Sequence, residues 1–516
     1  MTPAMSSSLS TFGFGVYSTL GGALIAACAV LGFLLLRCVW KAYQLRHFPG
    51  PKPSSVLFGH SLETQGIMYK SMDTYPEPFL SWMNQYGGAI YLRESLTPTL
   101  LITDPVACQH LLVQNASNYP RQSFFQAYFE DTFFGPNVST TNGAQHDMYK
   151  SLLMPLFSAK NVKAHVEIFE AHAQRCCDTV LTKFCKTKTA VDMKEVLAKL
   201  LLSTLGVSLL GCNVDEDPKT AKAFNDYLFV PRLGQFVSIL VHTWYLYLPL
   251  PSLVQRQAAR ETLKQTLTAV MEKKQARLDA PRDLMDLVTP HLSKDETLAH
   301  AMMLLTGGHE NGSTTLAWTF ATLANHPKVV ARIRHEYNSV LAKFGSLATD
   351  DAISHLTYTH AVVQETLRMH SPYLYRRVSV TGEQVPMAGG DAIYIPAGTS
   401  IRIQTAAMHR NPTYWTNPNA FVPERFMHGS AEWTADLALR GGKTHTSFYM
   451  PFGLGGMQCM ASRYIMAEMK LVVATFIGRF NFDVASDADL AHRFNAFTIA
   501  PTKLKMNVHN VEACRM

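Results

Sequence analysis

The sequence predicts a mainly helical fold of the α+β class, in which a large helical body carries a small amount of β structure. Three observations support this prediction. Helical periodicity dominates from Asp104 onward, two short segments alternate like β-strands at 79–103 and 391–403, and one apolar run near the N-terminus stands apart from the body. With 516 residues, 47% of them hydrophobic, the chain is long enough to bury a large core around one domain.

The N-terminal segment predicts a membrane anchor. Residues 16–36 form an uncharged apolar run about long enough to cross a bilayer as a helix. Basic residues follow from Arg37 onward, which predicts that this flank is cytoplasmic and that 1–15 is lumenal. A cleaved signal peptide is the alternative, but it would carry basic residues before its apolar run, and this chain has none there. The basic, proline-rich stretch 37–53 is then a hinge before a catalytic body at 54–516.

The β-like and helical patterns can be placed in order along the body. Residues 89–93 and 99–103 alternate as in a hairpin. Asp104, followed by a proline, is a typical helix start, and 158–212 contains long amphipathic stretches. The first third of the body is therefore expected to be a small sheet followed by helices.

The second half of the body repeats this alternation. Residues 255–345 are again mainly helical in pattern. The segment DAIYIPAGTSIRI, 391–403, predicts two strands around a Pro-Ala-Gly turn. The polar stretch 429–443 is expected to be a loop before the last long helix.

Charge and cysteine content exclude several classes of protein. The formal net charge of +7 is mild, and lysines and arginines are spread along the chain, so the footprint of a nucleic-acid-binding protein is missing. The 9 cysteines show no paired CxxC spacing typical of zinc sites. An odd, scattered set in a long chain is typical of reduced thiols on the cytosolic side of a membrane.

One cysteine has neighbours that suit chemistry. Three glycines precede Cys459 in PFGLGGMQCM, and a long helical pattern follows it. Glycines permit backbone geometry and close approach that other residues block. A cysteine at a helix N-terminus lies where free amides and the helix dipole stabilise its thiolate, the form that binds iron. A buried structural cysteine is the alternative for this residue taken alone.

This segment resembles the haem-binding loop of the cytochrome P-450 family, F-x-x-G-x-R-x-C-x-G. Phe452, Gly455 and Cys459 match, and the resemblance implies that Cys459 is the axial thiolate ligand of haem b. Met457 stands in place of the family's arginine, and Ala461 in place of its last glycine. Loss of the arginine removes a usual contact to a haem propionate.

A second motif supports the same resemblance. Glu365 and Arg368, one helical turn apart in QETLR, are similar to the family's ExxR motif, because FVPERF, which contains Arg425, follows at the expected place. A Glu-x-x-Arg pair taken alone is common on solvated helices. The resemblance implies a buried ion network behind the haem with a structural role, since paired charges tolerate burial.

The helix expected at 304–327 resembles the oxygen-binding helix of the family, (A/G)-G-x-(D/E)-T. Gly307, Gly308 and Glu310 match, and the resemblance implies that Glu310 takes part in proton delivery. A satisfied helix carboxylate is the alternative for Glu310. Asn311 replaces the family's threonine, but asparagine still hydrogen-bonds water or oxygen, so Asn311 is the second catalytic candidate.

Further residues match the surroundings of a haem. His146 and Lys150 occupy the positions of the family's W/H-x-x-x-R pair, and both can donate to a propionate; a surface histidine and lysine are the alternative. Either Arg376 or Arg377 is another propionate candidate, and the sequence does not choose between them. The aromatic residues within 124–134 are candidate walls of an apolar pocket.

Order and spacing of these motifs identify the chain as a member of the family from the proline hinge onward. The resemblance implies a triangular prism of helices with small β-sheets, and a haem-thiolate monooxygenase. Such an enzyme inserts one oxygen atom of O2 into a lipophilic small molecule: a sterol, terpenoid, polyketide or fatty acid, with secondary metabolism as one setting. The implied electron donor is an NADPH-dependent flavoprotein reductase, with cytochrome b5 as an optional second donor, at the endoplasmic reticulum membrane.

Two other functions stay open at this stage. Asn311 is compatible with a haem-thiolate isomerase or dehydratase that acts on a peroxide substrate without NADPH. Met457 and Lys150, which both replace family arginines, are compatible with a non-catalytic haem- or lipid-binding membrane protein. Consumption of NADPH and oxygen on substrate addition distinguishes the monooxygenase from the isomerase, and a haem that the reductase cannot turn over indicates the binding protein.

Overall fold

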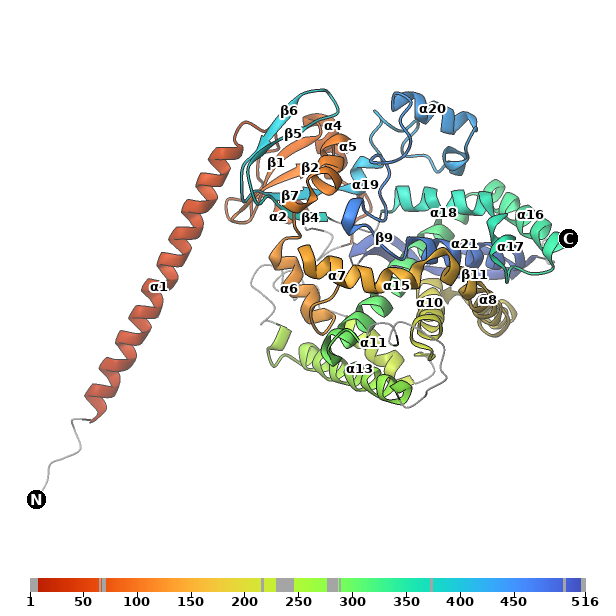
Figure 1. The fold of residues 1–516 in the computed structure, drawn as a ribbon, viewed down its shortest axis with the longest axis horizontal. Coiled ribbons are helices and arrows are strands. Elements are labelled where there is room, and N and C mark those ends of the chain that lie inside the picture. Colours follow the sequence, from red (N-terminus) through yellow and green to blue (C-terminus); the bar gives the residue numbers. More distant parts are fainter. Residues whose placement is uncertain are drawn as a thin grey trace, which may run out of the picture.

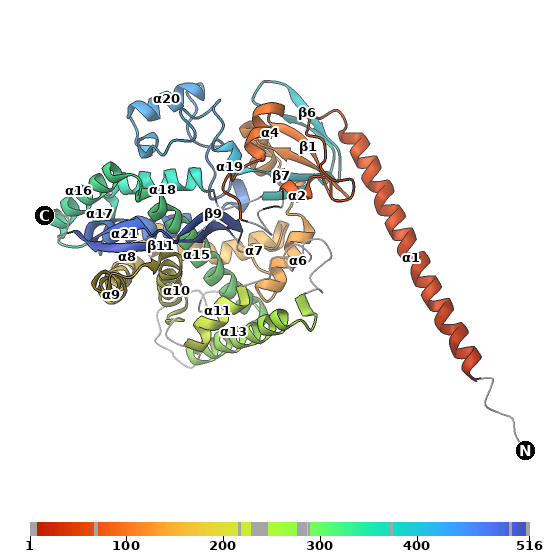
Figure 2. The same ribbon diagram turned by 180° about the vertical axis from the view of Figure 1, so that it is seen from behind.

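The long N-terminal helix is separate from the rest of the fold. The computed structural model describes residues 8–64, 66, 71–214, 218–228, 246–275, 286, 289–371, 375–494 and 498–511. Helix α1 (Ser8–Leu45) contains the predicted anchor and projects away from the body in both views (Figure 1, Figure 2). Among the described residues it is the one helix long and apolar enough to cross a membrane.

The C-terminal end of α1 is fixed to the body. Leu45 and Phe48 are buried in the same hydrophobic cluster as the first strands of the sheet. Lys41 donates a hydrogen bond to the carbonyl of Ala397. The helix therefore leaves the body at a defined place, beside the β-rich end (Figure 1).

A four-stranded sheet forms that end, in the order β1-β2-β7-β4. As predicted, β1 (Ala89–Glu94) and β2 (Thr97–Ile102) form an antiparallel hairpin. Strand β7 (Ser400–Ile403) pairs parallel to β2 and antiparallel to β4 (Tyr375–Val378). All four residues of β7 are buried, so this strand joins the two halves of the chain in the core of the sheet.

The two strands predicted in 391–403 exist, but they belong to different sheets. Strand β6 (Ala392–Ile395) pairs with β5 (Glu383–Pro386) in a separate hairpin, not with β7. The remaining strands lie near the C-terminal end of the chain or pair with it: β3 (Val191–Asp192), β8 (Phe480–Val484), β9 (Asp489–Phe494), β10 (Ile499–Lys503) and β11 (Lys505–Asn510).

Helices make up most of the body, in agreement with the predicted class. The shorter ones are α2 (Ser61–Thr64), α4 (Phe79–Tyr86), α5 (Pro105–Gln109), α6 (Ser123–Thr132), α7 (Gly143–Leu153), α9 (Thr182–Thr187), α11 (Pro218–Leu228), α17 (Asp350–Ser354), α18 (Thr357–Met369), α19 (Thr405–Met408) and α20 (Ala431–Leu439). The longer ones are α8 (Ala159–Cys176), α10 (Met193–Leu210), α13 (Pro251–Gln275), α15 (Lys294–Leu323), α16 (Pro327–Phe344) and α21 (Ser462–Arg479). Short π or 3-10 turns are η1 (His110–Gln114), η2 (Ala116–Asn118), η3 (Met154–Phe157), η4 (Cys177–Leu181), η6 (Pro423–Phe426) and η7 (Gly455–Met457).

Side-chain caps set several helix starts. The predicted start at Asp104 is confirmed, because its carboxylate accepts hydrogen bonds from the amides of Val106 and Ala107, both at 2.9 Å. Helix α15 begins at a capping box formed by Ser293 and Glu296, within the stretch 255–345 expected to be mainly helical and ten residues before the start expected for the helix at 304–327. It runs through the middle of the body and is buried along most of its length (Figure 1).

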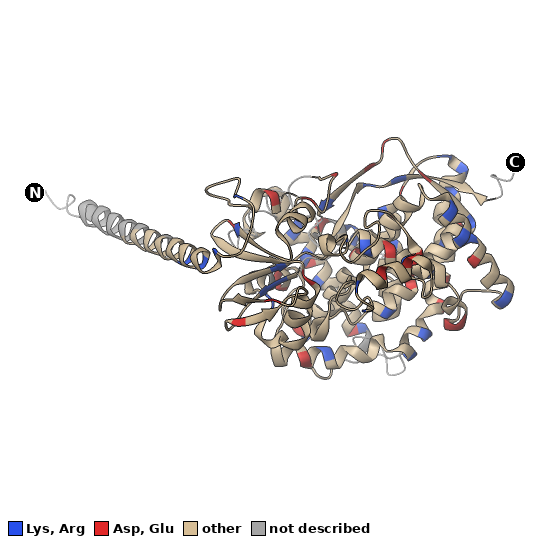
Figure 3. Ribbon diagram, turned by 90° about the horizontal axis from the view of Figure 1, so that it is seen from above, with Lys and Arg blue, Asp and Glu red and all other residues tan. Residues whose placement is uncertain are grey.

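The prediction of a loop over 429–443 was wrong, because this stretch contains α20. The Ser430 hydroxyl accepts a hydrogen bond from the Trp433 amide at 2.9 Å and caps the helix. The exposed positions of the helix are mainly alanine and leucine, and its buried residue is Asp436. Asp436 accepts hydrogen bonds from Arg425 and Thr416, which lie outside the helix. Lysines and arginines are mixed with aspartates and glutamates over the described body (Figure 3).

Candidate active site

A cavity lies between α15, α7, the end of α6 and the loop that precedes α21. The cavity has a volume of about 290 Å³, and most of its surface is apolar. Phe129 of α6 and Phe133, just after α6, line it, and their rings are stacked with their centroids 5.7 Å apart. Helix α15 contributes Met303, Leu304 and its glycine-rich segment. An apolar cavity of this kind suits a flat or lipophilic molecule.

Not all the aromatic residues predicted as walls line this cavity. Tyr128 packs instead with Leu246 and Leu253 in a separate cluster. The ring of Phe134 lies against the guanidinium of Arg260. The side chains at 124 and 125 lie outside the described residues.

The loop before α21 folds as its glycines require. Gly455 has φ +73, and a Cβ there would lie 2.0 Å from the carbonyl oxygen of Leu112 in η1, so only glycine fits. The Cys459 amide donates to the carbonyl of Phe452 at 2.8 Å, which closes the loop. The predicted glycine and phenylalanine positions therefore shape the loop that presents the cysteine to the cavity.

The sulfur of Cys459 faces the cavity. The residue has exposed surface and lines the cavity, so that surface forms part of the cavity wall. Burial raises the pKa of the Cys459 thiol, and the Ala461 amide and the charge of Lys150 offset only part of this rise. The expected contribution of the helix N-terminus is thus present, but in this structure burial outweighs it.

Four basic side chains line the cavity. His146 and Lys150 come from α7 as predicted, and Lys150 also donates to the carbonyl of Gly456. Burial lowers the pKa of His146, although Asp147 opposes that change. Arg121, just before α6, is the third, and sequence reasoning missed it because it belongs to none of the motifs.

The structure distinguishes the two arginines of β4. Arg377 is the fourth basic residue of the cavity wall. Arg376 points to the other face of the strand, where it forms an ion pair with Glu94. Arg402 joins that ion pair, so Arg376 belongs to a buried cluster of the sheet.

These residues fit a haem. A cysteine sulfur is a ligand for iron, and Lys150, Arg121 and Arg377 offer donors for two carboxylates at the cavity edge. Met457 lines the cavity where the family has arginine, so it contributes a thioether instead of a cation. The other basic residues leave the cavity with a cationic edge despite that replacement.

The two predicted catalytic residues on α15 point in different directions. Asn311 lines the cavity, and its side-chain nitrogen donates to the carbonyl of Gly307 at 2.6 Å. Glu310 is not among the cavity-lining residues: it pairs with Lys194 of α10 at 3.0 Å and with His309 at 3.3 Å. Burial alone would raise the pKa of Glu310, but the charges of Lys194 and His309 hold it well below its ordinary value.

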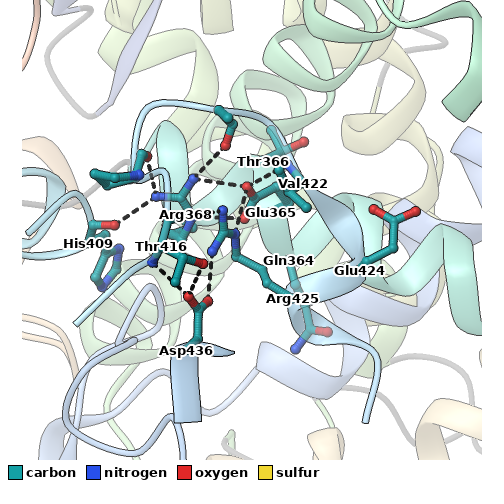
Figure 4. Close-up of polar contacts among 12 residues, drawn as sticks. Gln364, Glu365, Thr366, Arg368, His409, Thr416, Val422, Glu424, Arg425 and Asp436 are labelled. Carbon is teal, nitrogen blue, oxygen red and sulfur yellow. Dashed lines mark hydrogen bonds and ion pairs between the residues drawn. The ribbon is translucent and has the colours of Figure 1, made fainter. Parts of the chain in front are cut away.

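Behind the cysteine loop, the structure brings the three residues of the expected ion network together (Figure 4). Glu365 accepts from Arg368 Nε at 2.7 Å and Nη2 at 2.9 Å, and from Arg425 Nε at 3.1 Å. All three side chains are buried, and the guanidinium of Arg368 also donates to three backbone carbonyls. Every charge of this set is therefore compensated by a close partner.

Two further members of the network were missed. Asp436 of α20 accepts from Arg425 Nη1 at 2.7 Å. His409 connects the network to the cysteine loop, because its carbonyl accepts from Arg368 and its Nε2 accepts from the Met450 amide at 3.0 Å. Burial lowers the pKa of His409 to about 3, with a further contribution from Arg368, so its ring stays neutral and can accept. No local sequence signal marks either residue.

Comparison with known proteins gives a consistent result. The family model described as cytochrome P-450 matches residues 49–508. Cytochrome P-450 3A11 of Mus musculus is 25% identical over 480 residues, which cover 87% of this chain and 88% of the relative. Cytochrome P-450 3A5 of Homo sapiens is 24% identical over 489 residues (90% and 91%). Lithocholate 6-beta-hydroxylase of Mesocricetus auratus is 25% identical over 487 residues (90% and 91%).

Proposed function

The chain belongs to the cytochrome P-450 family, and from that premise we propose how its residues share the work of a haem-thiolate monooxygenase. The enzyme class, the cofactor haem b with a cysteine thiolate ligand, and reductase-derived electrons follow from the family. One observation carries our assignment of residues: the sulfur of Cys459 and the Gly307–Asn311 face of α15 line the same cavity.

The cavity residues hold the cofactor in this proposal. Cys459 binds the iron, and Arg121, Lys150 and Arg377 receive the propionates, with His146 as a neutral donor. When bound, the haem supplies dioxygen binding and O–O bond cleavage, which the electron donation of a thiolate favours. Phe452 and Gly455 fix the loop that carries the sulfur.

Asn311 and Glu310 handle protons in this proposal. The side-chain nitrogen of Asn311 is committed to the Gly307 carbonyl, so its oxygen is left to accept a hydrogen bond from a water in the cavity. Glu310 and Lys194 keep side-chain exposures of 13% and 20%, which supports proton exchange between this ion pair and solvent. Glu310 and Asn311 are neighbours in sequence but lie on different sides of α15. Glu310 faces Lys194 and solvent, and Asn311 faces the cavity.

The substrate and the setting are also part of the proposal. The apolar walls around Phe129 and Phe133 exclude water and suit a lipophilic small molecule, and a relative named as a lithocholate hydroxylase supports this class. We place the enzyme at the endoplasmic reticulum membrane, with 16–36 as a single-pass anchor, 1–15 in the lumen and 54–516 in the cytoplasm. Cytochrome b5 is a second electron donor in this scheme.

The test uses the purified full chain, loaded with haem and mixed with an NADPH-dependent reductase. Lipophilic compounds are screened for NADPH consumption and for a product that carries one atom of labelled O2. We expect both signals, and we expect Asn311→Thr to change the amount of product formed per NADPH. Product formation from a peroxide without NADPH would support the isomerase instead, and a bound haem that the reductase cannot turn over would support the binding protein.

A further inference from the structure

A buried contact joins three segments that are distant in the sequence: the stretch before α4, the residues after β7 and the C-terminal hairpin of β9 and β10. Tyr75, Ala406 of α19 and Ile499 of β10 form one buried cluster. The backbone of Met72 pairs with that of His492 in β9, and both hydrogen bonds are 2.8 Å long. The contact lies apart from the cavity of the candidate active site, because none of these residues lines that cavity.

Polar groups at this contact are buried without hydrogen-bond partners. The Tyr75 hydroxyl and both side-chain polar atoms of Gln404 have no partner among the described residues, although both side chains are almost completely enclosed. Burial raises the pKa of Tyr75 to about 12. The charges of Arg402 and Arg410 and the amide of Gln404 offset part of this rise, so these groups lie close to the hydroxyl. Buried polar groups cost free energy unless a ligand or a water binds them.

The cations around these groups outnumber the close carboxylates. Arg376 and Arg402 share the single carboxylate of Glu94. Arg410 donates from Nη2 to the carbonyl of Met369 at 2.8 Å, but it forms no ion pair with a carboxylate of the described residues. Its Nε is buried and has no hydrogen-bond partner among them. Because buried charges need close partners, this region contains more cationic charge than its carboxylates compensate.

Neighbouring side chains do not compensate this charge. Burial lowers the pKa of His492 to about 4, and the charge of Arg410 adds to this effect. Burial also lowers the pKa of His370 well below its ordinary value, with further contributions from His492 and Arg410. The carboxylates of Glu365 and Glu77 act on Arg410 only from beyond ion-pair distance. Neutral histidines and distant carboxylates leave the charge of Arg410 to be balanced by a ligand.

We propose that a small monovalent anion of the halide class binds between Arg410 Nε, the Tyr75 hydroxyl and the amide nitrogen of Gln404. All three groups donate hydrogen bonds, and a halide accepts from several donors while it supplies the negative charge that a water molecule lacks. The amide oxygen of Gln404, which a halide cannot satisfy, is left to a water. The anion stabilises the fold because it ties the stretch before α4 to the residues after β7. This inference does not depend on the proposed function, since none of the three residues lines the cavity.

The test measures the thermal midpoint of the haem-loaded full chain in sodium gluconate and in sodium chloride at the same ionic strength. Gluconate is too large for an enclosed site, whereas chloride fits it. In wild type we expect chloride to raise the midpoint by about 1–3 °C, since a ligand bound only by the folded protein stabilises it. Tyr75→Phe and Gln404→Leu should each lose more than half of this rise. Each variant is compared with itself in the two salts, so a lower starting stability does not affect the result.

Tyr358→Phe is the matched control, because it removes another buried tyrosyl hydroxyl, one that donates to Glu424 at 3.2 Å. It should keep the full rise. Crystals grown in sodium bromide locate the anion, and we expect an anomalous peak in contact with Arg410 and Tyr75. Equal midpoints of wild type in the two salts, a full rise in Tyr75→Phe or Gln404→Leu, or bromide peaks only at other places would overturn the inference. Water molecules would then bind these polar groups.

Discussion

Two glutamates of this protein are equally buried but have opposite surroundings. Glu365 is 0% exposed and lies among two arginines and the amide of Val422 (Figure 4). Glu468 of α21 is 1% exposed, and neither carboxyl oxygen has a hydrogen-bond partner among the described residues. Burial raises the pKa of Glu468 to about 8, and the nearby hydroxyl of Thr204 offsets only part of that rise.

The difference shows how this fold tolerates buried carboxyl groups. Near Glu365 the arginines and backbone donors compensate a full charge, and Arg425 also connects η6 to α20 through Asp436. Arg368 donates to the carbonyl of His409, whose ring accepts from the Met450 amide before the cysteine loop. Near Glu468 no cation of the described residues compensates the charge, so the carboxyl group keeps its proton at neutral pH. The first region is rigid and ionic, and the second is a neutral site whose stability depends on pH.

The largest loss of stability is expected when the ion network around Glu365 is disrupted. Glu365→Gln leaves the buried guanidinium of Arg368 without its carboxylate and leaves Arg425 with Asp436 as its carboxylate partner. We expect the free energy of unfolding to fall by about 3–5 kcal/mol, measured by chemical denaturation. Arg332→Met is the control, because the side chains of its ion pair with Glu424 are 46% and 29% exposed and the pair should contribute less than about 1 kcal/mol. Equal losses in the two variants would contradict the comparison.

Glu468→Gln tests whether the carboxyl group of the second glutamate is protonated in the folded protein. The folded protein holds a proton on Glu468 up to a pH of about 8, whereas the unfolded chain releases it near 4.5. The unfolded state therefore binds fewer protons in this interval, and the stability of wild type falls as pH rises. Relative to wild type, the variant should gain at most about 1.4 kcal/mol per pH unit between these values. A gain that does not depend on pH would show that Glu468 is already ionised.

A smaller effect is expected at Glu310, an intermediate case that pairs with Lys194 and His309 and is partly exposed. Lys194→Met removes the lysine of this set and should cost about 1–2 kcal/mol at pH 7, less than for a fully buried pair. Because the pKa of Glu310 is lowered in the fold, the ion pair stabilises the protein above the ordinary pKa of 4.5, and this contribution is lost as pH falls. The difference between wild type and variant in urea denaturation should therefore shrink in acid. A difference that persists unchanged would mean that Lys194 acts through packing.

Local signals in the sequence predicted much of the site. The cap at Asp104 and the hairpin of β1 and β2 depend on neighbouring residues, and both were predicted. Gly455 was expected from its motif, and its positive φ and close contact with η1 explain why glycine is needed there. Such features can be predicted from the sequence because the residue type itself satisfies the local geometry.

Features that depend on long-range packing were not predictable. Strand alternation puts Arg376 and Arg377 on opposite faces, but which face meets the cavity depends on how the sheet packs. Asp436 lies in a stretch expected to be a loop, and its ion pair with Arg425 depends on how α20 packs against η6. His409 acquires its role from the Met450 amide, 41 residues along the chain. Hydrogen-bond partners so far apart in the sequence cannot be predicted from the spacing of residues.

The reduced carbon-monoxide difference spectrum of the haem-loaded protein tests most directly whether Cys459 is the axial ligand. Wild type would be compared with Cys459→Ala and with Cys185→Ala, a control on the partly exposed helix α9. We predict a Soret band of the thiolate type in wild type and in Cys185→Ala, and its loss in Cys459→Ala. Retention of the band in Cys459→Ala, or its absence from haem-loaded wild type, would contradict the account.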